Sequence, residues 1–490
     1  MRRDSKAYDS ARPFRRRRAL RASARLTLWL LLATAALLPS VSPAAELISN
    51  PTLPIESIAV EGTRLVSAEL VTAESLLMPG EAYSEHELQQ AVFRIQRLPF
   101  VLTADFSLAR GSERGRYRLI IRIQEIRRWF FGEDATYTRF TNSVAFDSIL
   151  GQNYSVTPGG LAGIRLSVGK YGMLFGSISG RGGLQAGYTQ YNLFDRRAFF
   201  SIGLTRQACC PVQVLPLGLD PTFSSWRNEG DLNEARLTLG LPLQRRFQLR
   251  FQISEGYSER GERRDLLIPD ALPSFPRAAL GYEDLNRFQV ELTLTYDSTD
   301  DPVFPSRGMT WFLGLDHERL DAEPFVSPPS IFEPDVSLPD GVDRLPEFDS
   351  RQLRLAAGLT QHWRLFPRHT ATLSARLAIA RADVTALPFL TTATDESLIV
   401  ELVDGDDLDV LESYFTARWS MDLWGPGKTR KLGDLRFENT LEFGYDRLRQ
   451  DLDVGDNPLY RKSFTSSVVF RNSWGLFRFS FQIADYGRGF

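Results

Sequence analysis

The chain has very few residues of the types that bind transition metals or form covalent cross-links. Its 490 residues include two cysteines and four histidines. Cys209 and Cys210 are neighbours, and adjacent cysteines cannot easily close an unstrained disulfide. They are expected in a loop without chemistry, with a strained vicinal disulfide or a metal contact as the alternatives. No two histidines have metal-ligand spacing on one element, so neither a metal site nor a cofactor is predicted.

An excess of charge of one sign is also missing. The 58 Lys and Arg nearly balance the 60 Asp and Glu, for a net charge of -2. The chain therefore has no excess of positive charge that would attract nucleic acid. The sequence has no nucleophile elbow, no P-loop and no dinucleotide fingerprint. Gly180–Gly183 lies between two expected strands and predicts a turn rather than a phosphate cradle. No enzyme is predicted, and a barrel with an active site in its lumen is the one enzyme class left open.

Long apolar runs are absent beyond the first 40 residues. Arg15–Arg18 belong to a cationic segment, Leu26–Leu38 are apolar, and Ser42–Ala45 offer small residues for cleavage. This order is typical of a secretory signal peptide, assigned to residues 1–45. A membrane anchor is the alternative, although the run of ~13 apolar residues is shorter than the ~20 a spanning helix needs. Any membrane-spanning part of the mature protein must therefore be built from strands.

Aromatic residues and glycines, by contrast, are frequent. The chain has 33 Phe, 15 Tyr, 8 Trp and 36 Gly, a composition that suits many strands with frequent turns. From about residue 135, apolar and polar residues alternate in segments of ~10 residues separated by turns, which is typical of a transmembrane β-barrel. Clear examples are residues 247–253, 288–296, 373–379, 415–423 and 477–483. About 15 strands are evident. Because bacterial barrels usually have an even number, residues 135–490 are predicted to form an all-β barrel of about 16 antiparallel strands.

The polar faces of these segments carry isolated charges. A soluble β-sandwich also alternates, but isolated charges suit a wet lumen, and the export signal agrees with a membrane barrel. Long polar segments at 207–232, 257–286, 320–350 and 384–411 are expected to be external loops, with short turns on the periplasmic side. The side chains predicted to face the lumen are Arg250, Glu291, Arg376, Arg418, Glu438 and Arg478.

Residues 52–128 have the periodicity of a small α+β domain. A strand at Ile55–Val60 precedes two helices, the first opened by Ser67 as N-cap and the second by a capping box of Ser84 and Glu87. Two further strands follow, one around Phe106 and one at 119–123, joined by a turn at 111–115. The predicted order is strand, helix, helix, strand, strand.

This small domain resembles a POTRA domain, the periplasmic module that precedes outer-membrane assembly and secretion barrels. The resemblance lies in Ile58–Gly62, Tyr83–Glu85 and Arg97–Phe100. It implies that the domain binds client chains by adding a strand to an exposed sheet edge. The residues expected there are those of the second strand, Ala104, Phe106 and Leu108. An inert spacer domain is the alternative.

A second resemblance concerns the segment 296–308, which is similar to a strand and periplasmic turn of the BamA/TamA-type superfamily. Pro305 restricts φ, Gly308 can adopt conformations that other residues resist, and the acids can cap turn amides. Tyr191–Phe194 also resembles an early strand of that family. The residues assigned to the turn motif are Asp297, Asp300, Asp301, Pro302, Phe304, Pro305 and Gly308.

The resemblance implies a Gram-negative outer-membrane protein of the single-POTRA, bacterial surface antigen type, with the small domain in the periplasm. Its implied function is to assist insertion of outer-membrane proteins or translocation of a client. The implied partners are outer-membrane lipid, unfolded or secreted polypeptides, and periplasmic or lipoprotein accessory subunits. The alternative is a passive channel or surface-structural barrel without a client.

The chain departs from the family pattern at one point. The family usually carries an Arg-Gly-Tyr or Arg-Gly-Phe triplet in a loop that folds into the lumen. The corresponding segment here, 384–411, is acidic and has no such triplet. Whether this chain makes the family's usual contact in the lumen is therefore left open. Phe490 fits the aromatic C-terminus that barrel-insertion machinery recognises.

Overall fold

The computed structural model describes residues 52–140, 154–157, 160–179, 183–207, 212–213, 227–228, 232–243, 246–258, 280–326, 336–337, 348–392, 398–424, 433–449 and 459–488. The predicted signal peptide, Cys209, Cys210 and Phe490 lie outside these residues. Of the helices in the described residues, none is both long and apolar enough to cross a membrane.

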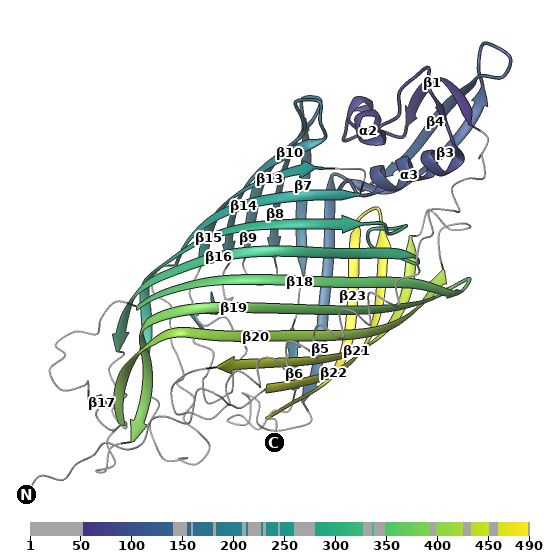
Figure 1. Ribbon diagram of the computed structural model, residues 1–490. Helices are drawn as coiled ribbons and strands as arrows, with labels where there is room; N and C mark the ends of the chain where they lie inside the picture. The colour runs from purple at the N-terminus through teal and green to yellow at the C-terminus, as the bar shows by residue number, and fades with distance from the viewer. Residues whose placement is uncertain are drawn as a thin grey trace, which may run out of the picture. The chain divides into compact units, whose positions relative to one another are not determined.

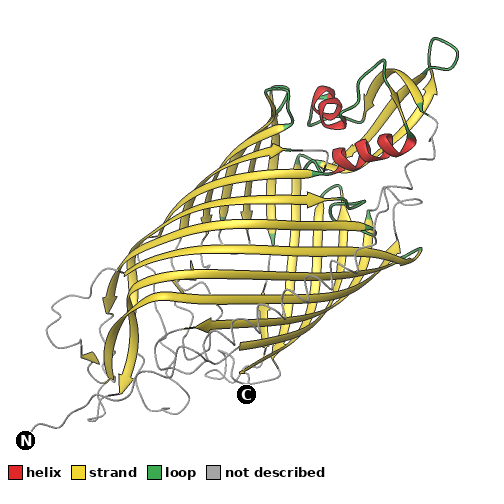
Figure 2. Ribbon diagram, in the orientation of Figure 1, coloured by secondary structure: helices red, strands yellow, loops and turns green. Residues whose placement is uncertain are grey.

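The small domain is a four-stranded sheet with two helices, the only helices that Figure 2 draws in red. The strand order is β2-β1-β4-β3, with β1 parallel to β4 and β3 antiparallel to it. The expected sequence of elements is present, with a two-residue strand added between the helices. The elements are β1 (Leu53–Glu61), α2 (Ala68–Ser75), β2 (Ala82–Tyr83), α3 (Glu85–Gln96), β3 (Val101–Arg110) and β4 (Tyr117–Glu125).

Both helices begin at the predicted caps. The Ser67 hydroxyl accepts a hydrogen bond from the Leu70 N–H, and Ser84 and Glu87 form the complete capping box. The helices cover one face of the sheet, where Phe100, Ile95 and Leu119 are fully buried. Burial of each such side chain stabilises the fold by about 1.5–3 kcal/mol, so packing against the helices stabilises the sheet.

The remaining long strands close into a barrel (Figure 1). Within the described residues, fifteen strands form the wall, because β6 and β7 both pair with β5 as one interrupted strand and β17 is a two-residue insertion. A further pair, β11 (Val212–Gln213) and β12 (Arg227–Asn228), forms a separate sheet. The wall elements are β5 (Trp129–Phe140), β6 (Tyr154–Thr157), β7 (Leu161–Val168), β8 (Gly172–Ser179), β9 (Leu184–Leu193), β10 (Ala198–Gln207), β13 (Leu232–Pro242), β14 (Phe247–Ser258), β15 (Leu280–Asp297), β16 (Gly308–Val326), β17 (Val336–Ser337), β18 (Phe348–Phe366), β19 (His369–Thr392), β20 (Leu398–Trp424), β21 (Asp434–Arg449), β22 (Leu459–Asn472) and β23 (Gly475–Arg488).

The barrel is confirmed, but its closure differs from the predicted all-antiparallel pattern. The last strand, β23, pairs in parallel with the first, β5, from Phe477 opposite Glu133 to Ala484 opposite Phe140. The physical reason is the count. In an up-and-down barrel with an odd number of strands, the first and last strands run in the same direction. We name the β5–β23 ladder the seam.

Two predicted boundaries are also corrected. The first barrel strand starts at Trp129, not at 135. The acidic segment 384–411, expected to be a loop, is largely the extended β19–β20 hairpin, in which Thr392 pairs with Leu398. Acidic composition predicts exposure to solvent, but it does not distinguish a loop from a strand. Two strands can pair through backbone hydrogen bonds in water even where they have no apolar face.

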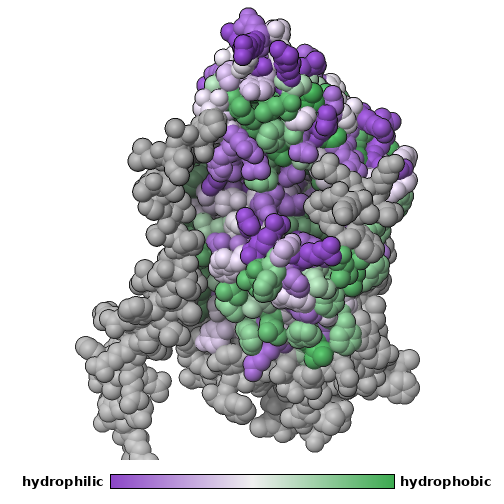
Figure 3. Space-filling model, turned by 90° about the vertical axis from the view of Figure 1, so that its right-hand side faces the viewer, coloured by the Kyte–Doolittle hydropathy of each residue, from purple (hydrophilic) through white to green (hydrophobic). Residues whose placement is uncertain are grey.

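Exposed apolar side chains alternate along the wall. On β23, Phe479, Phe481 and Ile483 are exposed on one face, whereas Arg478 on the other face is paired with Glu438. Apolar side chains gather in patches on the side of the molecule that Figure 3 shows. A closed sheet that carries apolar residues outward and charges inward is the pattern of a transmembrane barrel.

Candidate functional site

The turn between β15 and β16, residues 298–307, carries most of the predicted motif. Its acidic side chains accept hydrogen bonds from its own backbone. Asp300 binds the N–H groups of Ser306 (2.7 Å) and Arg307 (3.1 Å), and Asp301 binds those of Val303 (2.8 Å) and Phe304 (2.7 Å). The acids therefore satisfy turn amides that no strand partner reaches.

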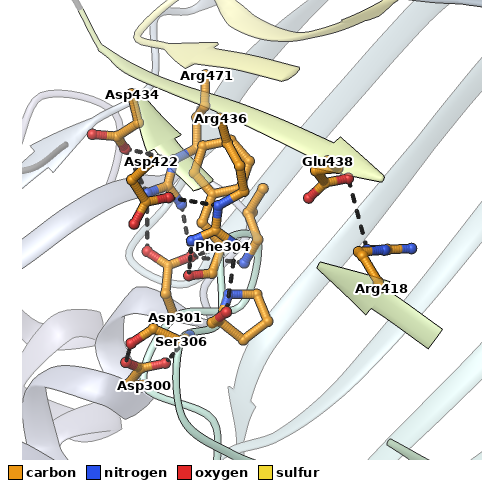
Figure 4. Close-up of polar contacts among 12 residues, drawn as sticks. Asp300, Asp301, Phe304, Ser306, Arg418, Asp422, Asp434, Arg436, Glu438 and Arg471 are labelled. Carbon is orange, nitrogen blue, oxygen red and sulfur yellow. Dashed lines mark hydrogen bonds and ion pairs between the residues drawn. The ribbon is translucent and has the colours of Figure 1, made fainter. Parts of the chain in front are cut away.

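This turn leaves its own strands and contacts a distant part of the wall, so we name it the crossing turn (Figure 4). The Phe304 side chain lies between two guanidinium groups, 4.7 Å from that of Arg436 on β21 and 4.8 Å from that of Arg471 on β22. Arg436 also donates to the carbonyl oxygens of Phe304 (3.2 Å) and Pro305 (3.4 Å). Strands β18, β19 and β20 separate β16 from β21, so the turn reaches across the end of the barrel.

Carboxylates hold both arginines. Arg471 forms a two-pronged pair with Asp301 (2.8 and 2.9 Å) and also binds Asp434 (2.7 Å), while Arg436 binds Asp422 (2.7 Å). Arg436 and Arg471 are 4% and 7% exposed, so these are desolvated pairs whose loss would be costly. Burial alone would raise the pKa of Asp301. The paired Arg471 and the two turn amides outweigh burial and place the pKa of Asp301 below its ordinary value.

The other end of the crossing turn contacts the small domain. Arg97, just after α3, donates from Nε to Asp297 Oδ2 (2.8 Å) and from Nη2 to the Thr299 carbonyl oxygen (3.0 Å). The Asp297 carboxylate also caps the Thr299 N–H (2.8 Å). Arg97 belongs to the POTRA-like motif and Asp297 to the turn motif, so the structure brings the two predicted motifs together.

The chain that leaves the small domain is bonded to the end of the seam. The Arg127 N–H donates to the Ser473 carbonyl oxygen (2.7 Å), and the Phe131 N–H donates to that of Trp474 (2.8 Å). The Arg127 guanidinium also lies 3.9 Å from the centre of the Trp474 ring. The linker is therefore held against the β22–β23 turn by backbone hydrogen bonds and a cation–π contact.

The residues predicted to face the lumen fall into three groups. Arg250 pairs with Glu291 (3.4 Å), and Arg418 and Arg478 share Glu438 at 3.8 and 3.6 Å. The Arg376 guanidinium lies 5.8 Å from the centre of the Phe312 ring. Charged side chains on this face are thus mostly arranged in pairs.

The residues predicted to bind a client lie on an edge strand. β3 pairs with β4, and no other described strand pairs with its opposite edge. The side chains of Ala104, Phe106 and Leu108 pack towards the core of the small domain, so only their backbone is available for pairing. Part of that backbone is occupied. Gln96 donates to the Ala104 carbonyl oxygen (3.1 Å), and Asp105 accepts from the Phe106 N–H (2.8 Å).

Sequence reasoning did not identify Arg436 and Arg471 as partners of the turn motif. Both arginines occupy inward positions in strands whose apolar and polar residues alternate, which predicts that they face the lumen. No sequence spacing, however, links them to a turn more than 130 residues away. Among the residues that the structure describes, no group of His, Cys, Asp and Glu is arranged to hold a metal ion.

No protein-family model matches the sequence, and no curated protein matches it. The structure is similar to that of BamA from Haemophilus ducreyi lacking POTRA domains 1–3, at 11% identity and a TM-score of 0.38, covering 89% of this chain and 85% of that one. CdiB from Acinetobacter baumannii is similar at 12% identity and a TM-score of 0.34, with 85% and 70% covered. The siderophore receptor PiuA from the same organism follows at 10% identity and a TM-score of 0.30, with 85% and 69% covered.

The sequence resembles BamA/TamA-type barrels, and a BamA barrel is among the structures to which the chain is similar.

Proposed function

We propose that this protein is an outer-membrane barrel that handles client polypeptides at its seam, inserting them into the membrane or passing them across it. The small domain is placed in the periplasm and collects the client. The observation that carries the proposal is the parallel seam, whose end is hydrogen-bonded to the linker from the small domain.

The first strand is held less continuously than the others. Parallel ladders are slightly less stable per residue than antiparallel ones, and the seam is parallel. On its other side, β5 pairs with the short β6 near Thr138 and with β7 near Phe131, rather than with one unbroken strand. Separation of β5 from β23 would expose two backbone edges, which are templates for pairing with another chain.

The small domain offers a second edge for the same client. The outward backbone groups of β3 beyond Phe106 belong to Leu108 and Arg110, because Gly111 and every second residue before it bond towards β4. Strand addition at this edge would use main-chain hydrogen bonds and would suit clients of varied sequence.

A reversible disulfide lock across the seam tests the proposal. Thr136 and Ser480 are register partners there, so T136C and S480C are introduced together into a background that carries C209S and C210S. We expect oxidised cells that depend on this variant to lose outer-membrane proteins or an exported client, measured by quantitative proteomics of the outer membrane. A reductant should restore them.

The matched control places the lock in an antiparallel ladder, at Thr238 and Gln252, whose side chains are in contact. This variant is expected to support normal outer-membrane composition under oxidising conditions. If the seam-locked protein supports normal composition as well, and carries steady ion current in planar bilayers, the passive-channel alternative is correct.

A further inference from the structure

A cavity of about 870 Å³ lies where the small domain meets the end of the barrel. The small domain contributes α2 and the loop that follows it, and the barrel contributes the turns after β7, β9 and β13. Both sides supply large apolar side chains that are exposed, at 41% for Leu76, 63% for Met78 and 56% for Leu243. Exposed apolar groups that gather in this way mark an interaction surface. We name these three residues the apolar rim.

Leu76 has a backbone conformation that favours glycine. It is the C-cap of α2, and its φ of +58° lies in the left-handed region, where a Cβ is unfavourable. The β9–β10 turn, which lines the same cavity, repeats this pattern, because Phe194 has a φ of +56° and is 86% exposed. Two large apolar side chains thus stay exposed on strained backbones. Strain of this kind is typical of functional surfaces.

Polar contacts fix α2 against the end of the barrel. The Arg197 guanidinium in the β9–β10 turn pairs with Glu74 of α2, and both side chains are half-buried. At the other end of the helix, the Ser67 hydroxyl donates to the Lys170 carbonyl oxygen in the β7–β8 turn (2.7 Å). The loop that follows α2 is therefore held at the end of the wall.

An aromatic belt marks the level of the membrane boundary on the outer face of that wall. The rings of Phe247, Tyr296 and Trp311 pack together, with centres 5.0, 5.7 and 5.9 Å apart. They lie on the same face of the sheet as the exposed Leu292. Aromatic side chains of barrels concentrate at the interface between membrane and water. Leu243 lies beside this belt, because its N–H donates to the Phe247 carbonyl oxygen (3.1 Å).

The apolar rim is continuous with the lipid-facing wall, because Leu243 extends the outer face of β13 beyond the exposed Leu241. We propose that the apolar rim binds the membrane itself, with Leu76 and Met78 inserted among the phospholipids of the leaflet next to the small domain. The small domain is then attached to lipid as well as to the barrel, which fixes its tilt relative to the membrane plane. This contact does not depend on whether the protein handles a client.

Charged side chains determine how deep the contact reaches. Glu69, Asp195 and Arg196 line the same cavity and are exposed. Charged groups are costly in the hydrocarbon centre of a bilayer but stay hydrated among the headgroups. The apolar rim is therefore expected at the boundary between headgroups and acyl chains, where amphipathic segments of peripheral proteins bind.

The test is spin labelling of the full chain in vesicles of phosphatidylethanolamine and phosphatidylglycerol. M78C is introduced into a background that carries C209S and C210S, and the new cysteine is labelled with a nitroxide. Electron paramagnetic resonance then compares the access of two reagents to the label, namely oxygen, which partitions into lipid, and a water-soluble nickel chelate. Because Met78 is exposed, its replacement should not disturb folding. L76C provides a second label position.

Two control positions calibrate the ratio of oxygen access to nickel access. R114C lies in the exposed β3–β4 turn and reports water, and L292C lies on the outer face of β15 and reports lipid. We expect the ratio at positions 76 and 78 to be several-fold higher than at 114 and to lie between the two controls. A ratio no higher than at 114 would overturn the proposal. Low access of both reagents would also overturn it, because protein rather than lipid would then cover the apolar rim.

Discussion

Arg471 binds two carboxylates, Asp301 of the crossing turn and Asp434 of β21, from an almost fully buried position. In R471Q, both carboxylates lose a charged partner, and Asp301 is left in a site where burial opposes its ionisation. Breaking one partner of a buried pair typically costs about 3–5 kcal/mol. We therefore expect the free energy of unfolding to fall by about that amount, measured by urea titration of the barrel in detergent micelles.

The control for this variant is R319Q, which removes an exposed partner of Asp321. Exposed pairs contribute about 0–1 kcal/mol, so R319Q should be close to wild type. Equal stability of the two variants would show that the crossing turn is not held by Arg471.

At the scale of the element, the crossing turn depends on Gly308. Its φ of +104° is unfavourable for other residues, and a Cβ there would collide with the Ser298 carbonyl oxygen. G308A should therefore destabilise the barrel by more than about 1 kcal/mol. It should also weaken the contact of Phe304 with the two arginines, which is read as faster cleavage of the turn by an added protease.

The comparison for G308A is G314A further along the same strand, β16, where an added Cβ meets nothing closer than 3.7 Å. Protease cleavage in G314A should remain at the wild-type rate. If G308A is equally resistant, the shape of the turn does not depend on its glycine.

For the molecule as a whole, Arg97 joins the small domain to the crossing turn. The crossing turn also contacts the barrel wall, through Arg436 and Arg471. R97A removes the first of these contacts. We expect faster proteolysis of the linker at 126–128 with no change in the unfolding temperature of the barrel. R122A removes a different arginine of the small domain, one whose pair with Glu61 is exposed, and should not change the rate. A linker equally protected in R97A would mean that Arg97 does not restrain the domain.

Much of this architecture is encoded in short stretches of sequence. The capping box at Ser84 and Glu87 predicts where α3 begins, and the alternation around Phe479 and Phe481 predicts a strand with two different faces. The acids and glycine of the crossing turn predict a tight turn, because such residues satisfy amides and accept unusual φ values locally. Composition misled where polarity does not decide between loop and strand, as in 384–411 and in parts of the predicted loops 257–286 and 320–350.

The sequence alone determined the class of fold, the small domain before the barrel, and the residues of the turn, because these follow from periodicity and from interactions within about ten residues. Only the tertiary structure decided the parallel seam and the contact of the crossing turn with Arg436 and Arg471. Each of these depends on how the strands are brought together when the barrel closes. The count of strands sets the direction of the last pair, and residues more than 100 positions apart then meet across the lumen, which no local pattern records.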